Sequence, residues 1–269
     1  MCSPQNGSCE PEAPGMADHE VIEEASRLIQ SLLVERRRAE RMQQEFLSVI
    51  SHELRTPLAS MLGALGLLRS PRIAAQPRRA DELLEIAERN GGRLLRMIND
   101  LLDLQRLETG ALCFQLGSVQ VGDLLEKAVD GVREMALLYK VRVVAAPMAA
   151  TACLMTDKDR VGQVLHNLLS NAVKHSPAEG EVVLAGQVVG SRVEISVHDA
   201  GAGIPETFKD RLFESFAQAE PSSVRHHGGA GLGLSISKKI IEGLGGTISI
   251  DSSQAKGTTV AVLLPLQAV

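Results

Sequence analysis

The chain has 269 residues, of which 44% are hydrophobic and 23% are charged, a composition typical of soluble globular proteins and a length sufficient for two domains. Aromatic residues make up only 2% and the net charge is −5, which argues against base stacking and against a basic surface for nucleic acid. No apolar run reaches the roughly 18 residues that a transmembrane helix needs, so we expect a cytoplasmic chain or the cytoplasmic piece of a larger protein. The four cysteines lack metal-binding spacing, which favours reduced thiols.

The N-terminal region divides into two parts. Residues 1–19 are rich in Pro, Gly, Ser and Glu, and we expect them to be disordered. Residues 20–45 carry mostly apolar side chains at alternating steps of three and four, which predicts a signalling helix paired with a second copy as a coiled coil. The alternative is one amphipathic helix that lies on its own domain, but the narrowness of the seam favours the dimer. The seam consists of Ile22, Ala25, Ile29, Leu32, Arg36, Ala39, Gln43 and Phe46.

Residues 46–110 are expected to form a helical hairpin. The helical pattern continues to Leu68 and stops at Ser70-Pro71, because the residue before a proline disfavours the helical conformation. A second amphipathic stretch begins near Arg79 and ends at Thr109-Gly110, where glycine can terminate a helix. One hairpin cannot bury both of its apolar faces, whereas two hairpins can do so as a dimeric four-helix bundle.

The remaining residues, 111–269, mix helical and strand-like patterns, so the fold class of the chain is α+β. A sheet with helices on one face is expected. Val189-Gly190-Ser191 is typical of a hairpin turn, which predicts neighbouring antiparallel strands. The expected helices are 121–138, 157–174 and 232–244, and the expected strands are 140–145, 181–189, 193–198, 247–251 and 258–264.

His52 is the candidate nucleophile on the first helix of the hairpin. It lies about 200° around the helix from Ile50, so it points to solvent if Ile50 faces the bundle core. A neutral imidazole has a lone pair with which it can attack an electrophile. The carboxylate of the adjacent Glu53 can hold the proton of the other ring nitrogen and thereby raise the nucleophilicity of the ring.

Pro57 interrupts the same helix one turn after His52. A proline inside a helix removes one backbone hydrogen bond and costs about 3 kcal/mol, which favours a local bend. The alternative is an ordinary solvated histidine, followed by a proline that ends the helix. The complete string from Ser51 to Leu58 decides against this alternative, because it resembles the H-box of histidine kinases, a long and specific motif.

Four further segments resemble motifs of the same family and follow one another in the family's order. Asn167–Ser176 resembles the N-box and Asp199–Ile204 the first glycine box. Leu212–Phe216 resembles the F-box and Gly229–Leu234 the second glycine box. A single glycine repeat would be weak support, whereas five ordered motifs make the chain similar to sensor histidine kinases from about residue 41 to residue 266. The resemblance implies dimerisation and phosphotransfer helices at 46–110, followed by an α/β sandwich of the Bergerat ATP-binding type at 111–269.

The resemblance also implies ATP and Mg²⁺ as ligands of the second domain. Asn167, Asn171 and Lys174 share one helical face, with Asn171 as the principal Mg²⁺ ligand and Lys174 as a positive charge for phosphate. Asp199 would accept a hydrogen bond from the adenine amino group. Glycines let the backbone approach the nucleotide, and the start of a helix favours phosphate. The glycine-box and F-box residues assigned to this site are Gly201, Gly203, Phe213, Phe216, Gly229, Gly231, Gly233 and Leu234.

The long polar segment from Thr207 to Gly228 is expected to be a mobile lid over the nucleotide. Arg225 is its candidate phosphate contact, and a solvated loop charge is the alternative. Two residues depart from the family pattern. Ala230 stands where the family often has threonine, which weakens nothing essential because backbone amides bind the phosphate. His175 stands where the family often has an aromatic residue, and it either packs near the nucleotide or covers the helix.

The resemblance implies an enzyme that phosphorylates His52 from ATP and passes the phosphoryl group to an aspartate on the receiver domain of a response regulator. Family members with the Glu53-x-x-Thr56 arrangement often also dephosphorylate that regulator, and the Thr56 hydroxyl would orient the attacking water. Alternatively, that hydroxyl bonds back to the preceding helical turn.

Two other functions are alternatives to the kinase. The first is a degenerate kinase that regulates another kinase by heterodimerising, which the intact His52, Asn171 and glycine boxes argue against. The second is an ATPase of the gyrase class, which the H-box hairpin argues against. The stimulus, the particular regulator, and whether each subunit phosphorylates itself or its mate do not follow from the sequence.

Overall fold

The structure is a computed structural model whose contacts divide the chain into two units, Met1–His52 and Glu53–Val269. The described residues are 16–70, 73, 76–148, 152–217, 231–253 and 256–266.

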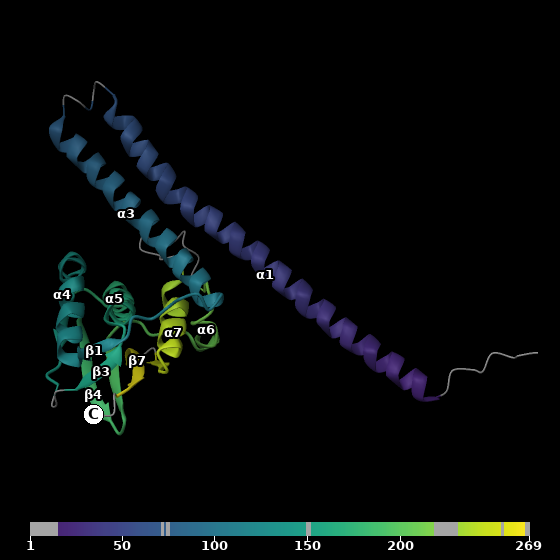
Figure 1. Cartoon of the computed structure of the whole chain (residues 1–269). Coiled ribbons are helices and arrows are strands. Elements are labelled where there is room, and N and C mark those ends of the chain that lie inside the picture. The colour runs from purple at the N-terminus through teal and green to yellow at the C-terminus, as the bar shows by residue number, and fades with distance from the viewer. Residues whose placement is uncertain are drawn as a thin grey trace, which may run out of the picture. The chain divides into compact units, whose positions relative to one another are not determined.

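The first unit is the N-terminal part of one long helix, α1, which spans Met16–Leu68 (Figure 1). Since α1 begins at Met16, the boundary expected at residue 20 comes too late, and residues 1–15 lie outside the described part of the chain. In this unit Ile29 is 57% exposed and Leu32 is 55% exposed. Both belong to the predicted seam, so the single chain leaves this apolar stripe uncovered.

The second unit begins with a helical hairpin formed by the end of α1 and by α3, Pro77–Glu108. Pro57 is buried inside α1, and the helix continues past it to Leu68. The alternative in which this proline ends the helix is therefore wrong. Helix α3 starts with Pro77 in its first turn, where the missing N–H costs nothing. It ends at Glu108, and Gly110 follows with φ at 66°, as the glycine stop predicts.

The hairpin leaves part of its apolar surface exposed in the single chain. Ala64 of α1 and Met97 and Leu104 of α3 are buried. Other leucines and isoleucines on the same two helices are between 41% and 61% exposed, which matches the expectation that a second hairpin completes a bundle. These exposed residues are Leu58, Leu62, Leu65, Leu67, Leu84, Leu95, Ile98 and Leu102.

The α/β part of the second unit is built on a five-stranded sheet in the order β2-β4-β5-β7-β6 (Figure 1). Helices α4, α5 and α7 pack on this sheet. Every second residue of β5 is buried, so one face of the sheet forms the core with the helices. The strands are β2 (Arg142–Ala145), β4 (Glu181–Val189), β5 (Arg192–Asp199), β6 (Thr247–Ser253) and β7 (Gly257–Pro265), and the helices are α4 (Val121–Tyr139), α5 (Lys158–His175) and α7 (Gly233–Gly243).

Three features of this part were not predicted from the sequence. Strands β2 and β4 pair in parallel, because helix α5 lies in the connection between them, whereas the other pairs are antiparallel. A second, two-stranded sheet joins β1 (Gly117–Gln120) to β3 (Cys153–Thr156), and a short helix α6 spans Glu206–Lys209. The expected hairpin turn is present, since Val189 pairs with Arg192 and Gly190 has φ at 59°. None of the helices that the described residues form is both long and apolar enough to cross a membrane.

Candidate nucleotide and phosphoacceptor site

The candidate acceptor, His52, is exposed on α1, as the helical periodicity predicts. The next residue, Glu53, is 7% exposed, and its Oε2 accepts a hydrogen bond from Nη2 of Arg93 on α3 at 3.3 Å. A charged partner is needed here because a buried carboxylate without one is costly. The role of Glu53 at the imidazole ring therefore stays a prediction, and Arg93 is a partner that the sequence did not reveal. Thr56 is exposed one turn further along α1.

Helix α5 carries the three N-box residues assigned to ATP and metal. Its N-terminus is capped by Asp157, whose Oδ1 accepts from the backbone N–H groups of Asp159 and Arg160, each at 3.1 Å. Asn171 and Lys174 are half-buried further along the helix. The cap and the buried apolar face of α5 fix the direction in which its polar side chains project.

Asn167 joins α5 to the start of α7. Its Nδ2 donates to Oγ of Ser237 at 2.9 Å, and Ser237 is buried. A Cβ at Gly233 would collide with the Asn167 side chain, so the second glycine box needs a glycine at this position to let the two helices approach. Leu234 is half-buried in the first turn of α7. Ser237 was not predicted from the sequence, because a serine on an expected helix carries no signal of its partner.

Asp199 ends β5 with its carboxylate buried, at 7% exposure for the residue. Its Oδ1 accepts from the N–H of Gly201 at 2.9 Å. Burial raises the pKa of this carboxyl, and the raise is opposed by the Gly201 N–H, by the charges of His175 and His198, and by the Thr258 N–H. The result is an acceptor held in a site of restricted solvent access.

The first glycine box is held closely by its neighbours. A Cβ at Gly201 would collide with the carbonyl oxygen of His175, the last residue of α5. Gly203 has φ at 73°, a left-handed conformation that glycine adopts readily. The N–H of Ile204 donates to Oγ of the buried Ser252 at 2.9 Å, which ties the loop to β6. Helix α5 thus contacts both glycine boxes, through Asn167 at Gly233 and through His175 at Gly201.

The F-box precedes the segment 218–230 and the end of the second glycine box follows it, and a backbone hydrogen bond joins the two motifs. The N–H of Phe216 donates to the carbonyl of Gly231 at 2.9 Å, and both residues have positive φ, at 67° and 69°. Phe213 is half-buried, and Nζ of Lys238 lies 5.5 Å from the centre of its ring. Arg225, Gly229 and the lid around them lie outside the described residues.

A second polar contact links α3 to α5. The carboxylate of Asp103 is 9% exposed and its Oδ2 accepts from Nη1 of Arg160 at 2.7 Å and from Nε2 of Gln163 at 2.9 Å. Nη1 of Arg160 also donates to Oε1 of Gln163 at 2.8 Å. The nearby Asp100 has its pKa raised to about 6, mainly by burial and then by Asp103, with Arg96 acting in the opposite direction. These contacts anchor α3 against the nucleotide-binding helix.

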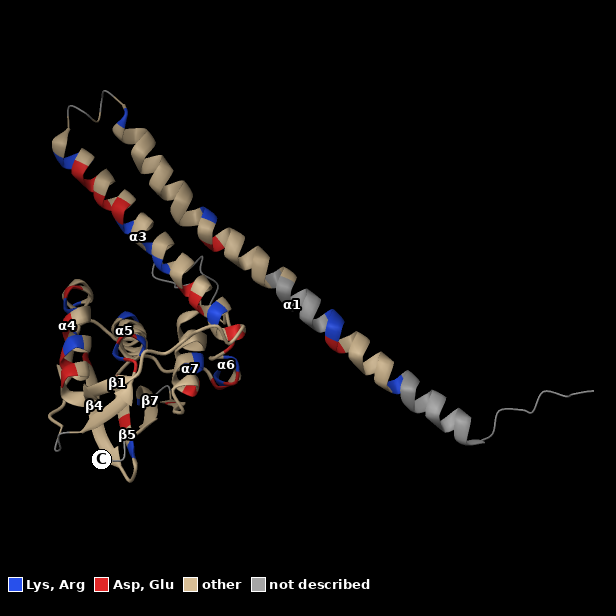
Figure 2. Cartoon of the chain, viewed as in Figure 1, with Lys and Arg blue, Asp and Glu red and all other residues tan. Residues whose placement is uncertain are grey.

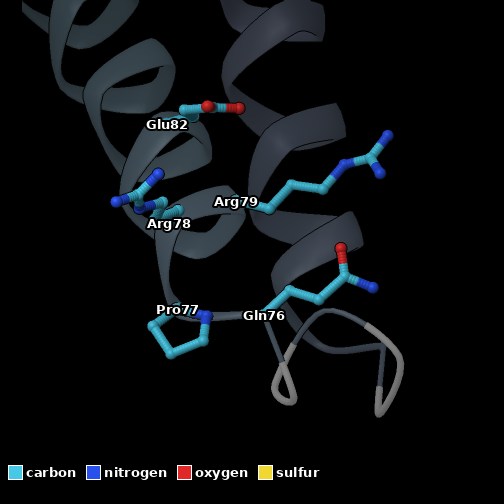
Figure 3. A pocket seen from close by; sticks show the side chains of 5 residues that line it. All are labelled: Gln76, Pro77, Arg78, Arg79 and Glu82. Atoms are coloured by element: carbon cyan, nitrogen blue, oxygen red, sulfur yellow. The ribbon is translucent and has the colours of Figure 1, made fainter.

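A cavity of about 580 Å³ lies away from all these residues, at the start of α3 (Figure 3). It is lined by Gln76, Pro77, Arg78, Arg79 and Glu82. Figure 3 shows the two arginine side chains pointing to different sides of the helix, so they do not converge on one ligand. No residue of the five motifs lines it, and it carries no functional assignment.

The side chains assigned to the metal offer oxygen atoms as ligands, which suit magnesium better than a softer metal. The described part of the chain contains no group of three or more His, Cys, Asp and Glu side chains arranged around a metal position. The N-box instead offers the amide oxygens of Asn167 and Asn171 on one helix. Oxygen ligands at few protein positions, completed by water and phosphate, are what Mg²⁺ takes in nucleotide sites, so the residues fit the ion implied by the resemblance.

Comparisons with known proteins agree on one family. Residues 42–110 match the family model described as the His Kinase A (phospho-acceptor) domain, and residues 156–268 match the histidine kinase-, DNA gyrase B-, and HSP90-like ATPase model. The chain is 34% identical over 252 residues to the circadian input-output histidine kinase CikA of Synechococcus elongatus, covering 93% of this chain and 33% of CikA.

Two further matches support the same family. The chain is 33% identical over 258 residues to the autoinducer 2 sensor kinase/phosphatase LuxQ of Vibrio cholerae, covering 94% of this chain and 30% of LuxQ. The solved structure of full-length ShkA in complex with AMPPNP is similar with a TM-score of 0.63 at 28% identity, covering 84% of this chain and 46% of that chain. The chain therefore spans about a third of the length of these two curated relatives.

Proposed function

The chain belongs to the histidine kinases, and on this premise we propose that it phosphorylates His52 from ATP and then passes the phosphoryl group to an aspartate on the receiver domain of a response regulator. The observation that carries the proposal is that α5 contacts both glycine boxes, at Gly233 through Asn167 and at Gly201 through His175. One helix thereby brings together the residues assigned to adenine, metal and phosphate.

ATP would be recognised at its two ends by different elements. The buried Asp199 carboxylate would accept a hydrogen bond from the adenine amino group. Gly231 and Gly233 lead into α7, whose N-terminal N–H groups favour a phosphate. Lys174, near the end of α5, adds a positive charge for the polyphosphate. The nucleotide would also be bordered by two F-box residues, Phe213 and Phe216, and by Leu234 at the start of α7. The proposed set of nucleotide-binding residues is completed by Gly203, Gly229 and Arg225.

We assign Asn171 as the principal Mg²⁺ ligand, with Asn167 beside it on α5. When bound, the ion neutralises charge that accumulates on the phosphate oxygens. The protein's own part is to hold the two amide oxygens on one helical face. The Asn167 amide is oriented by its hydrogen bond to Ser237, which accepts from the NH₂ group, and its Oδ1 lies against Gly233 at the start of α7.

At His52, one ring nitrogen would form the bond to the γ-phosphorus while the bond from that phosphorus to the bridging oxygen of ADP breaks. Glu53 would accept the hydrogen bond of the other ring N–H, which keeps the attacking nitrogen unprotonated. In the second step the phosphoryl group leaves the ring nitrogen for a carboxylate oxygen of the receiver aspartate. Both steps depend chiefly on alignment and charge neutralisation, since phosphoryl transfer needs little covalent help from a protein.

The proposed assembly is a homodimer that is paired through residues 20–45 as a coiled coil and through 46–110 as a four-helix bundle. The exposed leucines of the hairpin support this, because a second copy would bury them. The catalytic ATP-binding domain is assigned to residues 111–269. The use of ATP supports a cytoplasmic place of action, and neither a nucleic acid nor a membrane span of this chain enters the mechanism.

Labelling with [γ-³²P]ATP and Mg²⁺ tests the proposed activity. We expect label that is lost in acid and retained in alkali, as for phosphohistidine, and transfer of that label to a receiver domain. His52→Gln should abolish labelling and leave nucleotide binding at the wild-type level, because Gln keeps the length and polarity of the side chain. Undiminished labelling of His52→Gln would remove His52 from the mechanism.

Dephosphorylation of the regulator is a second candidate activity. Thr56 is exposed on α1 one turn after Glu53, and LuxQ, which matches 94% of this chain, is a kinase/phosphatase by name. The Thr56 hydroxyl would orient a water for attack on a phospho-aspartate. Thr56→Ala should then slow regulator dephosphorylation while His52 labelling continues. Equal dephosphorylation rates in Thr56→Ala and wild type would instead assign the hydroxyl a structural role within α1.

A further inference from the structure

Ser252 is a buried serine near the end of β6 whose hydroxyl meets two other parts of the chain. The residue is 3% exposed. Its Oγ accepts from the N–H of Ile204, in the first glycine box, at 2.9 Å. The same Oγ lies 3.2 Å from the carbonyl oxygen of Gly257 and 2.8 Å from Oγ1 of Thr258, both at the start of β7. A single hydroxyl thereby joins β6, the start of β7 and the loop that follows β5.

The donor and the acceptor in each of these contacts follow from the capacity of a hydroxyl, which has one proton and two lone pairs. The carbonyl of Gly257 can only accept, so Ser252 donates its proton there, and the N–H of Ile204 can only donate, so Ser252 accepts. Thr258 then donates to the second lone pair. Loss of this hydroxyl would leave a backbone N–H and a backbone carbonyl without this partner, which is costly in a buried place.

The partners of Ser252 on β7 lie beside Asp199, the residue assigned to adenine. Thr258 is 8% exposed and stands directly opposite Asp199 in the pairing of β5 with β7. A Cβ at Gly257 would collide with the carbonyl oxygen of Asp199, so glycine is needed for this close approach. Strand β7 carries no charged residue (Figure 2). It therefore offers Asp199 hydrogen-bonding groups instead of a counter-charge.

The loop of the first glycine box is held by hydrogen bonds near both of its ends. Oδ1 of Asp199 accepts from the N–H of Gly201 at 2.9 Å, and the N–H of Ile204 is held by Ser252. Gly203 lies between these points and turns the loop with φ at 73°. Because the carboxylate of Asp199 is bonded to this loop, its orientation depends on the position of the loop. A hydrogen bond weakens steeply when its donor and acceptor are misaligned.

We propose that Ser252 is a positioning residue for recognition of the nucleotide base, whose hydroxyl holds the first glycine box so that the Asp199 carboxylate faces the adenine amino group. This inference rests on the proposed function, which assigns Asp199 to adenine, and adds the residue that maintains base selectivity. Ser252 acts through Ile204 and Thr258 and does not itself contact the nucleotide. A fixed carboxylate favours adenine, whose amino group donates, over hypoxanthine, which has an oxygen in its place. A displaced carboxylate would lose that preference.

The test compares the affinities for ADP and for IDP, which carries hypoxanthine, by calorimetry on the full chain with Mg²⁺. Ser252→Ala should weaken ADP binding by about fivefold to tenfold, the size expected from one or two hydrogen bonds, and IDP binding by less than about twofold. Ser253→Ala is the matched control, because Ser253 is the next residue of β6 and is exposed, and it should bind both nucleotides like wild type. Ser252→Cys, whose thiol donates and accepts weakly, should give an intermediate ratio of affinities.

The rate of His52 labelling at varied ATP concentration gives a second measurement. Ser252→Ala should raise KM for ATP by about fivefold to tenfold and leave the rate at saturating ATP within about twofold of wild type, because the groups assigned to metal and phosphate are unchanged. A variant that is merely less folded would instead show a lower rate at unchanged KM. Circular dichroism at the assay temperature measures the folded fraction, and Ser252→Cys replaces Ser252→Ala in both assays if the latter is unfolded there.

The outcomes separate this inference from the proposed function. If Ser252→Ala keeps the wild-type ratio of ADP to IDP affinity, while wild type prefers ADP and labels His52, the inference is wrong and the proposed function stands. An equal loss of affinity for ADP and IDP would also overturn the inference, because it would show a general structural role. If wild type binds neither nucleotide, or binds both equally, the assignment of Asp199 to adenine fails, and the inference fails with it.

Discussion

Asp100 on α3 should reduce the stability of the folded protein at neutral pH, and replacing it with asparagine should relieve this loss. Burial, and after it the charge of Asp103, raise the pKa of Asp100 from its ordinary value of 3.8 to about 6, and Arg96 opposes this rise. The difference between these two pKa values corresponds to at most about 3 kcal/mol of unfolding free energy, at roughly 1.4 kcal/mol for each pKa unit. Asp100 is only half-buried, so solvent screening reduces the expected effect of Asp100→Asn to about 1 kcal/mol.

The sign of the pH dependence follows from proton binding. Because the folded-state pKa lies above the unfolded-state value, the folded protein binds more protons between about pH 4 and pH 6. The contribution of Asp100 to stability therefore falls as the pH rises through this window and stays low above it. Asparagine does not titrate, so the stability gained by Asp100→Asn should be near zero at pH 4 and complete at about pH 7.

Urea unfolding at pH 4, 5, 6 and 8, followed by circular dichroism at one protein concentration, measures this difference. A fixed concentration is required because dimer stability depends on it. Asp81→Asn is the control, since Asp81 is an exposed aspartate on the same helix. The reasoning is refuted if Asp100→Asn is no more stable than wild type at pH 8, or if its gain is the same at every pH.

Three further predictions follow from other contacts. Asp103→Ala should lower the unfolding free energy by about 2 kcal/mol in urea titrations, because it leaves the partly buried Arg160 without its carboxylate; an unchanged midpoint would contradict the anchor. Asn171→Asp should sharply reduce labelling of His52, because it alters metal coordination and adds negative charge beside the phosphates, and labelling at the wild-type rate would refute the assignment. Light scattering at micromolar concentration should give the mass of a dimer, and a monomeric mass would exclude the proposed bundle.

The sequence was a good guide to elements that have a strong apolar period. Helix α3 was expected from near Arg79 and begins at Pro77, and strand β4 was expected at the residues where it lies. Periodicity locates such elements because one face of each is buried along its whole length. The two strands β1 and β3 were missed, since four residues hold too few alternations, and their pairing joins residues 117–120 to residues 153–156.

The charge pairs between helices were not predictable from the pattern. Glu53 and Arg93 are 40 residues apart, and Asp103 and Arg160 are 57 residues apart. Each of these side chains has many possible partners of opposite charge in the sequence, and the choice among them depends on how the helices pack. The same limit applied to Ser237, which meets Asn167 only because Gly233 lets α7 approach α5. The motifs identified the residues of the proposed site, and the packing supplied their supports.

Helix α3 connects the two halves of the proposed chemistry. Arg93 contacts Glu53 in the acceptor motif, and Asp103 contacts Arg160 and Gln163 on the N-box helix. These two contacts are about 15 Å apart on one continuous helix. A rotation or shift of α3 against α1 would therefore alter both contacts at once.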